Sequence, residues 1–241
     1  MSATALAEYM ITQAAEQQNI LHDSRFTRPP IVTANADAMR ALRAYNCDPR
    51  RPSSTLEKVK DALTIRAKSI GLKPKNRDEA LRCIEIIKMF ERSENALGLR
   101  SMALRPAPRF DLIDIEGVTV SVQPDCLVDG LTNHVGAGLI RVAKAPDPAA
   151  CKMEDTRARR GDHRREMARY MVALIQILLE AQDGALGTPD RDFCFVADVR
   201  LGERIGPADN HARRLRDIRA ACRTISTLWP SIYPRHSVLR R

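Results

Sequence analysis

Hydrophobic positions recur at helical spacing in four stretches of the chain. The first begins near Ser53, which can cap a helix, and ends before Gly71. The second covers about residues 78–98 and has its apolar positions along one side. A long, mostly apolar helix is predicted for residues 163–182, and an amphipathic one for residues 209–228.

Shorter apolar segments between these helices predict strands. Residues 111–116 and 118–122 alternate apolar and polar positions and are expected to form a hairpin with one solvent-facing side. A third, more buried strand is predicted within residues 135–143, and residues 193–199 are apolar enough for the middle of a sheet. We expect the segments 118–122, 138–142 and 193–199 to share one sheet, with the long helix packed across it.

Prolines divide the N-terminal region from the rest. Residues 1–52 are predicted to form an N-terminal arm with a short helix near residues 3–18, either folded over or mobile, because Arg28-Pro29-Pro30 and Pro52 break the chain. Residues 53–241 are predicted to form a single α/β domain. Within it, Arg105-Pro106-Ala107-Pro108 is expected to be a hinge-like linker into the sheet.

The charge balance suggests a polyanionic partner. The 241 residues include 39 Lys and Arg against 30 Asp and Glu, which gives a net charge of +9. Residues 211–241 hold eight arginines and one acid, Asp217. Nucleic acid is the first partner to consider; the alternative is that the positive charge only keeps the protein in solution.

Cysteine usage and the longest apolar stretch indicate the cellular compartment and the relation to membranes. The six cysteines form no CxxC pair and stand at no zinc-finger spacing from histidine, so they are predicted to be reduced core residues in a cytoplasmic protein. The longest apolar stretch, residues 170–179, is about half of what a bilayer needs. No membrane association is predicted.

The order helix, three strands, helix, strand over residues 77–199 carries a family resemblance. With Pro124-Asp125 at the end of the middle strand, it resembles the αβββαβ core of the PD-(D/E)XK nuclease superfamily, the restriction-endonuclease-like fold, with a mixed central sheet flanked by helices. The overall pattern is also similar to bacterial proteins with no assigned activity. Members of this superfamily typically hydrolyse phosphodiesters with Mg²⁺.

The resemblance implies a metal site that is incomplete in this chain. Asp125 would be the first Mg²⁺ ligand, with Glu91 or Glu94 as the helical one; alternatively, Asp125 only forms a turn. The acid-x-Lys tripeptide falls on Leu139-Ile140-Arg141, where leucine cannot bind metal and arginine is a poor proton-transfer group. Lys144 is the candidate to replace the missing lysine amine. Asp114, Asp129 and Asp198 are the candidates to replace the missing carboxylate.

The arginine clusters support nucleic-acid binding more strongly than the incomplete metal site supports catalysis. Arg216, Arg219 and Arg223 form one helical stripe, and Arg164 with Arg165 belongs to a second cluster at the start of the long helix. The first hypothesis is a protein of nuclease-like fold that binds nucleic acid, with DNA as the first candidate. Its catalysis would be weakened or absent. The alternative is an interaction module whose arginines meet an acidic protein surface, and the third is an active Mg²⁺-dependent nuclease with migrated ligands.

Overall fold

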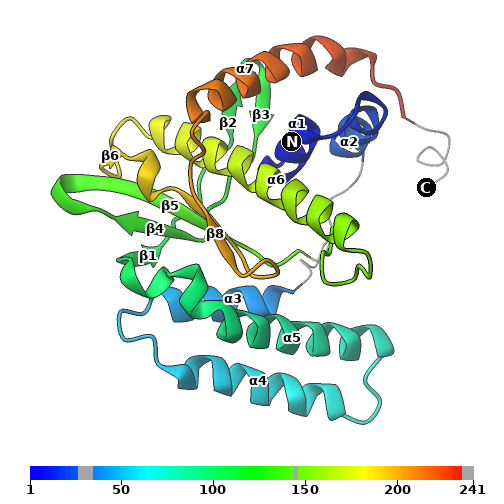
Figure 1. The fold of residues 1–241 in the computed structure, drawn as a ribbon, viewed down its shortest axis with the longest axis vertical. Helices are drawn as coiled ribbons and strands as arrows, with labels where there is room; N and C mark the ends of the chain where they lie inside the picture. Colours follow the sequence, from blue (N-terminus) through cyan, green and yellow to red (C-terminus); the bar gives the residue numbers. More distant parts are fainter. Residues whose placement is uncertain (27–34, 144–145, 235–241) are drawn as a thin grey trace.

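A mixed β-sheet forms the centre of the molecule (Figure 1). The structure is a computed structural model that describes residues 1–26, 35–143 and 146–234. Within these ranges the sheet has six strands, with five in line and β6 pairing beside β5: β1 (Leu104–Pro106), β4 (Cys126–Asp129), β5 (His134–Arg141), β7 (Phe195–Asp198), β8 (Glu203–Ile205) and β6 (Thr188–Pro189).

Of the five strands in line, only β5 and β7 are parallel neighbours. Strand β4 is antiparallel to both β1 and β5, β5 and β7 are parallel, and β8 is antiparallel to β7. Helix α6 (Glu154–Glu180) makes the crossover that a parallel pair requires. The predictions that residues 138–142 and 193–199 share one sheet and that the long helix packs on it are confirmed.

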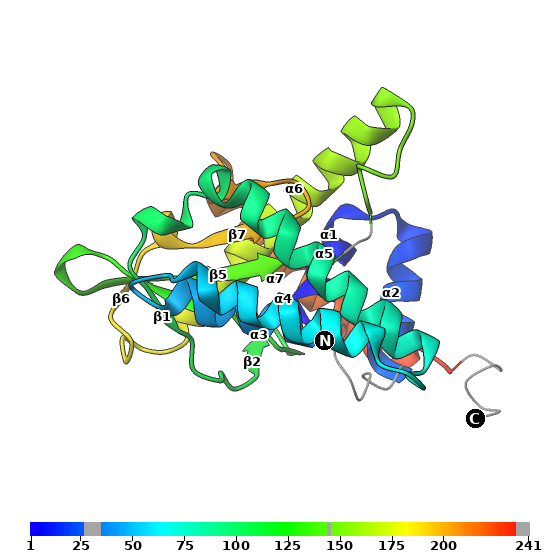
Figure 2. The ribbon, with the colours of Figure 1, turned by 90° about the horizontal axis from the view of Figure 1, so that it is seen from below.

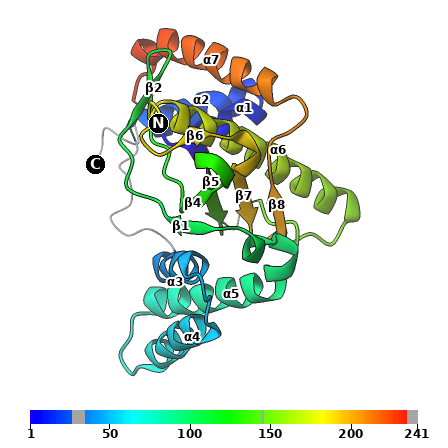
Figure 3. The same cartoon turned by 90° about the vertical axis from the view of Figure 1, so that its left-hand side faces the viewer.

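Helices cover both faces of the sheet (Figure 3). Alternate residues of β5 point to opposite faces, so Ala137 joins the core beneath α6 while Ile140 joins the core on the other face. The first core also takes in α1 (Ala3–Ile11) and α7 (His211–Leu228). The second is covered by three helices: α3 (Ala36–Cys47), α4 (Ser53–Lys68) and α5 (Pro74–Leu97). The prediction of an α/β fold with a mixed central sheet flanked by helices is confirmed.

The predicted hairpin exists but lies outside the central sheet. Strands β2 (Ile113–Ile115) and β3 (Val118–Val120) pair only with each other, so the prediction that 118–122 shares the central sheet is wrong. Val118 and Val120 are buried because α1 and α7 cover that side of the hairpin. Alternation reports one buried face and does not tell which element covers it. The first strand of the sheet is instead β1, which overlaps the predicted linker at Arg105 and Pro106.

The N-terminal helices pack onto the body of the protein. In α1, Leu6 and Ala7 are fully buried in the core shared with α6. Helix α2 (Ala14–Phe26) follows, and α3 buries Leu42 and Tyr45 in the other core. Of the two alternatives for the arm, the described part is therefore folded over.

Helix α6 begins nine residues earlier than its apolar pattern predicts. Its first turn carries Glu154 and Asp155, which suit the positive end of a helix dipole. Figure 2 shows this end of α6 extending away from the sheet, where few apolar residues are needed. The six cysteines are free and all but Cys47 are buried. In the described ranges no helix has the length and apolar character to span a bilayer.

Candidate functional site

Asp125 directly precedes β4, at the junction with β5 and α3. The prediction that it ends the middle strand is wrong, because β3 stops at Val120. Its backbone N–H donates to the Gly138 carbonyl (2.8 Å), which extends the β4–β5 register by one residue. One carboxylate oxygen accepts from the Ile140 N–H at 2.6 Å, and the other pairs with the Arg43 guanidinium. Both oxygens therefore already have donors, and a metal ion would have to displace Arg43.

The environment of Asp125 also disfavours its charge. The side chain is 3% exposed, and burial raises the pKa of Asp125 although the Ile140 N–H and Arg43 oppose that shift. The neighbouring surface is a cavity of about 480 Å³ whose lining includes Arg43, Cys47 and Pro106. Continuing the register beyond Cys126↔Gly138 places Asp125 opposite Leu139, whose side chain supplies no oxygen.

The helical acids expected to complete a metal site pair elsewhere. Glu91 accepts from Lys60 of α4 at 2.6 and 2.9 Å. Glu94 accepts from the Tyr45 hydroxyl at 2.5 Å and from Arg100 at 2.6 Å. The structure therefore does not bring either glutamate together with the carboxylate expected to share its metal. No cluster of three or more His, Cys, Asp or Glu suited to a metal occurs within residues 1–26, 35–143 and 146–234.

The alternative carboxylates serve local roles. Asp114 accepts from the Gly117 N–H (3.0 Å) in the β2–β3 turn, and Asp129 pairs with Arg105 (2.8 Å). Asp198 is fully buried among arginines. Lys144, the expected replacement amine, lies outside the described residues.

Arg141 ends β5 beneath α6. Its guanidinium contacts the Arg164 carbonyl (3.4 Å), the Met167 sulfur (3.0 Å) and the Asp198 carboxylate (3.5 Å). Burial, followed by the charge of Arg164, lowers the pKa of Arg141 to about 10. The expected catalytic arginine is 6% exposed and is held by α6 and β7, so its partners belong to the core.

Arg164 forms a buried ion pair that the sequence analysis missed. Its Nε and Nη2 donate to the two oxygens of Asp198, both at 2.8 Å, and it also donates to the carbonyls of Ala143 and Pro146. With 0% exposure, Arg164 cannot reach a phosphate, and this corrects its assignment to a nucleic-acid surface. The signal was present: Arg164 stands three residues before Met167, on the apolar stripe of the helix.

Arg165 and the α7 arginines remain accessible to different degrees. Arg165 is half-buried and makes a two-pronged pair with Glu203 of β8 (2.7 and 2.8 Å), which lowers the pKa of Glu203. Arg216 and Arg219 are exposed, with no acidic partner among the described residues. Arg223 is exposed and pairs with Glu116 in the β2–β3 turn at 3.1 Å. The assignment of these residues to nucleic-acid binding stays a prediction.

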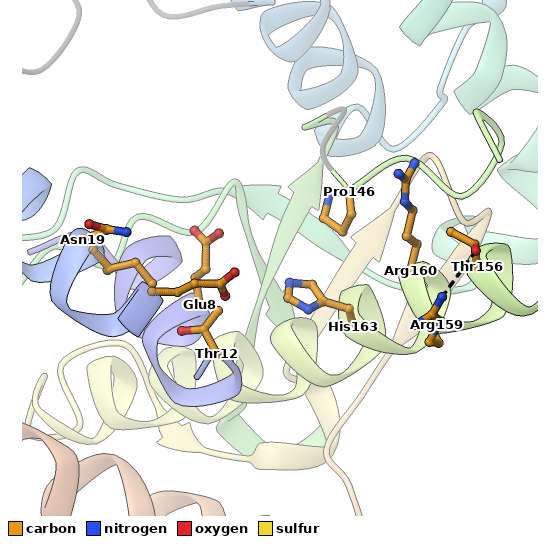
Figure 4. Close-up of a pocket in the computed structure, with 10 residues that line it drawn as sticks. Glu8, Thr12, Asn19, Pro146, Thr156, Arg159, Arg160 and His163 are labelled. Atoms are coloured by element: carbon orange, nitrogen blue, oxygen red, sulfur yellow. Dashed lines mark hydrogen bonds between the residues drawn. The ribbon is translucent and has the colours of Figure 1, made fainter. Parts of the chain in front are cut away.

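A cavity of about 640 Å³ between α1–α2 and α6 was not foreseen. Glu8 of α1 and Thr12, which directly follows α1, line one side of it, while Arg159, Arg160 and His163 line it from α6 (Figure 4). Arg160 is anchored to the Asp147 carbonyl at 3.0 Å. Opposite charges face each other across the cavity, so its walls favour no single sign of ligand charge.

Comparison of the chain with protein-family models, with curated proteins and with solved structures gives no match.

Proposed function

We propose that this protein binds nucleic acid on a divergent PD-(D/E)XK-like framework and does not cleave it. The observation that carries the binding function is the row of exposed arginines on α7, two of which have no acidic partner in the described part of the chain. Unneutralised cations on a rigid helix are suited to phosphate contacts.

Support for the framework comes from the elements around Asp125. Along the chain, the elements that build and cross the central sheet come in the order α5, β1, β4, β5, α6, β7, with Asp125 directly before the second of these strands. This order is similar to the one the resemblance implies once the β2–β3 hairpin is counted as an insertion, with the difference that Asp125 stands before the second strand and not at its end. The carboxylate contacts the next strand through the Ile140 N–H.

Support for absent cleavage comes from the same residues. Mg²⁺ needs several convergent oxygens, whereas Asp125 faces Leu139 in register and is occupied by Arg43. Arg141, in the place of the lysine, is committed to the core contacts beneath α6. Among the described residues, a phosphate group would find neither a set of metal ligands nor a lysine amine at this position.

The α7 stripe provides the first test. Replacing Arg216, Arg219 and Arg223 together by Gln removes up to three phosphate contacts, so the salt dependence of duplex DNA binding should flatten by up to about 2.7 in the slope of log K against log salt. Affinity should fall at low salt, and stability should change little because the stripe is exposed. Fluorescence anisotropy with a labelled duplex measures both quantities.

The matched control removes the same charge from arginines that already have acidic partners, and binding should stay near wild type: Arg82→Gln, Arg105→Gln and Arg191→Gln. Equal losses in the two triple variants would mean that net charge alone governs binding. Wild-type protein that fails to bind DNA or RNA at low salt would overturn the proposal and favour an interaction module for an acidic protein.

A further inference from the structure

The turn between α4 and α5 concentrates positive charge. Between Asp61 and Asp78 the chain has no acid and five basic residues: Arg66, Lys68, Lys73, Lys75 and Arg77. We call residues 65–77 the hairpin tip. All five cations are exposed, and among the described residues only Arg66 has an ion-pair partner, Asp37 at 3.0 Å. Four positive charges therefore stand without an acid to neutralise them.

The chemistry of these cations differs from that of the rest of the protein. Five of the eight lysines in the chain fall within residues 58–75, although arginine is the more frequent basic residue overall. Arginine suits fixed, two-pronged pairs such as Arg164 with Asp198, whereas lysine is a flexible point charge. Flexible lysine side chains can adjust to a row of backbone phosphates whose positions vary.

Two isoleucines stand in solvent among these charges. Ile65 is 71% exposed and Ile70 is 104% exposed. The packing side of α4 is a different one, on which Leu56 and Leu63 are buried. Neither isoleucine is therefore needed for the core, and together with the lysines they form a surface that is both cationic and apolar.

The hairpin tip stands on a firmly packed base. Leu63 of α4 and Ile87 and Phe90 of α5 are buried in one core, and Lys60 is paired with Glu91 across the two helices. Figures 1 and 2 show α4 and α5 side by side, with the tip at their far end and α7 on the opposite side of the sheet. The tip is thus an exposed surface that packed helices hold in place, and it is separate from the α7 stripe.

We propose that the hairpin tip is a second nucleic-acid contact, in which its lysines bind backbone phosphates and Ile70 packs against sugar or base edges of a duplex. This inference rests on the proposed function, and it adds a surface that the α7 stripe does not include. An exposed aliphatic side chain beside cations fits a groove lined by phosphates and apolar sugar edges. An anionic membrane fits less well, because two isoleucines bury much less apolar surface than a stable anchor needs.

Two tip variants separate charge from apolar contact. In duplex titrations across salt, Lys68→Gln with Lys73→Gln and Lys75→Gln should flatten the slope by up to about 2.7 and weaken binding at low salt. Ile70→Ser should weaken binding by about tenfold without changing the slope, since it removes no charge. The triple control at Arg82, Arg105 and Arg191 loses the same charge as the lysine variant and should keep the wild-type slope. Circular dichroism checks that each variant is folded.

The outcomes distinguish this inference from the proposed function. If wild type binds the duplex and the lysine variant keeps its slope, the tip is not a contact and the proposed function stands. If wild type does not bind, both are overturned. If the tip variants instead lose sedimentation with vesicles containing phosphatidylserine while DNA binding is unchanged, the surface is a membrane contact and the inference is wrong.

Discussion

Arg164 joins three parts of the fold from a position without solvent exposure. It pairs with Asp198 at the end of β7 and donates to carbonyls at Ala143 and Pro146, while Asp198 also accepts from the N–H groups of Arg200 and Leu201. Each buried polar group in this network has a partner, which is the condition under which a buried ion pair is tolerated.

Removing one partner should be strongly destabilising. Arg164→Met keeps much of the side-chain volume but removes the two-pronged partner of the buried Asp198 carboxylate and leaves only Arg141 at 3.5 Å, so the free energy of unfolding should fall by about 3–5 kcal/mol. The neighbouring Arg165→Met breaks a pair that is partly exposed and should cost about 0–1 kcal/mol. Urea unfolding of both variants measures the difference. Similar small losses would show that the buried pair contributes no more than the surface one.

Asp125 should leave a signature in the pH dependence of stability. Its folded pKa is raised by burial above the ordinary value of 3.8, so the native state holds this proton more tightly than the unfolded state. Stability from this group is present at low pH and is lost as pH rises through the raised pKa. Wild type should therefore lose stability relative to Asp125→Asn between about pH 4 and neutrality.

Urea unfolding at a series of pH values gives that comparison, because the asparagine can still accept from the Ile140 N–H and does not titrate. A difference that grows in favour of wild type with rising pH would mean that Arg43 lowers the pKa more than burial raises it. The account of an occupied, charge-disfavouring position at Asp125 would then be wrong.

At the scale of elements, sequence periodicity located helices α4 to α7 and the parallel pair β5 and β7, but not α2, α3 or β4. Helices α4 to α7 follow the predicted stretches because each buries an apolar side against the sheet or its neighbour. The pattern could not assign the β2–β3 hairpin to its own sheet, since alternation reports burial and not pairing. It also missed β1, an edge strand of three residues that contains Pro106, where a missing N–H is tolerated.

For the candidate site, the sequence could predict some strand positions but not the partners of the side chains. Asp125 was expected at the end of a strand and instead directly precedes β4, a strand that the pattern did not predict; only its place beside the strand of residues 138–142 was anticipated. The partners of Glu91, Glu94 and Arg164 depended on which helix faces meet, and a single sequence carries no record of Lys60, Tyr45 or Asp198 as their neighbours. For Arg164 the sequence signal was its place on the apolar stripe, three residues before Met167.

For the whole molecule, the two cationic surfaces lie on different sides of the sheet, one on α7 and one at the hairpin tip (Figure 1). Several phosphate contacts would give binding that weakens steeply with salt, and a net charge of +9 without organised contacts would give a weaker dependence. Cleavage would require a held metal ion, for which the described residues offer no cluster of ligands.

The most direct measurement is a titration of the wild-type protein with a labelled duplex between about 50 and 200 mM salt, in Mg²⁺ and in EDTA, with the DNA recovered afterwards and its length determined. The account predicts affinity that falls steeply with salt, little difference between Mg²⁺ and EDTA beyond competition for phosphates, and intact DNA. Absence of binding at the lowest salt would contradict the binding claim. Mg²⁺-dependent cleavage that Asp125→Ala abolishes would contradict the claim that the site is inactive.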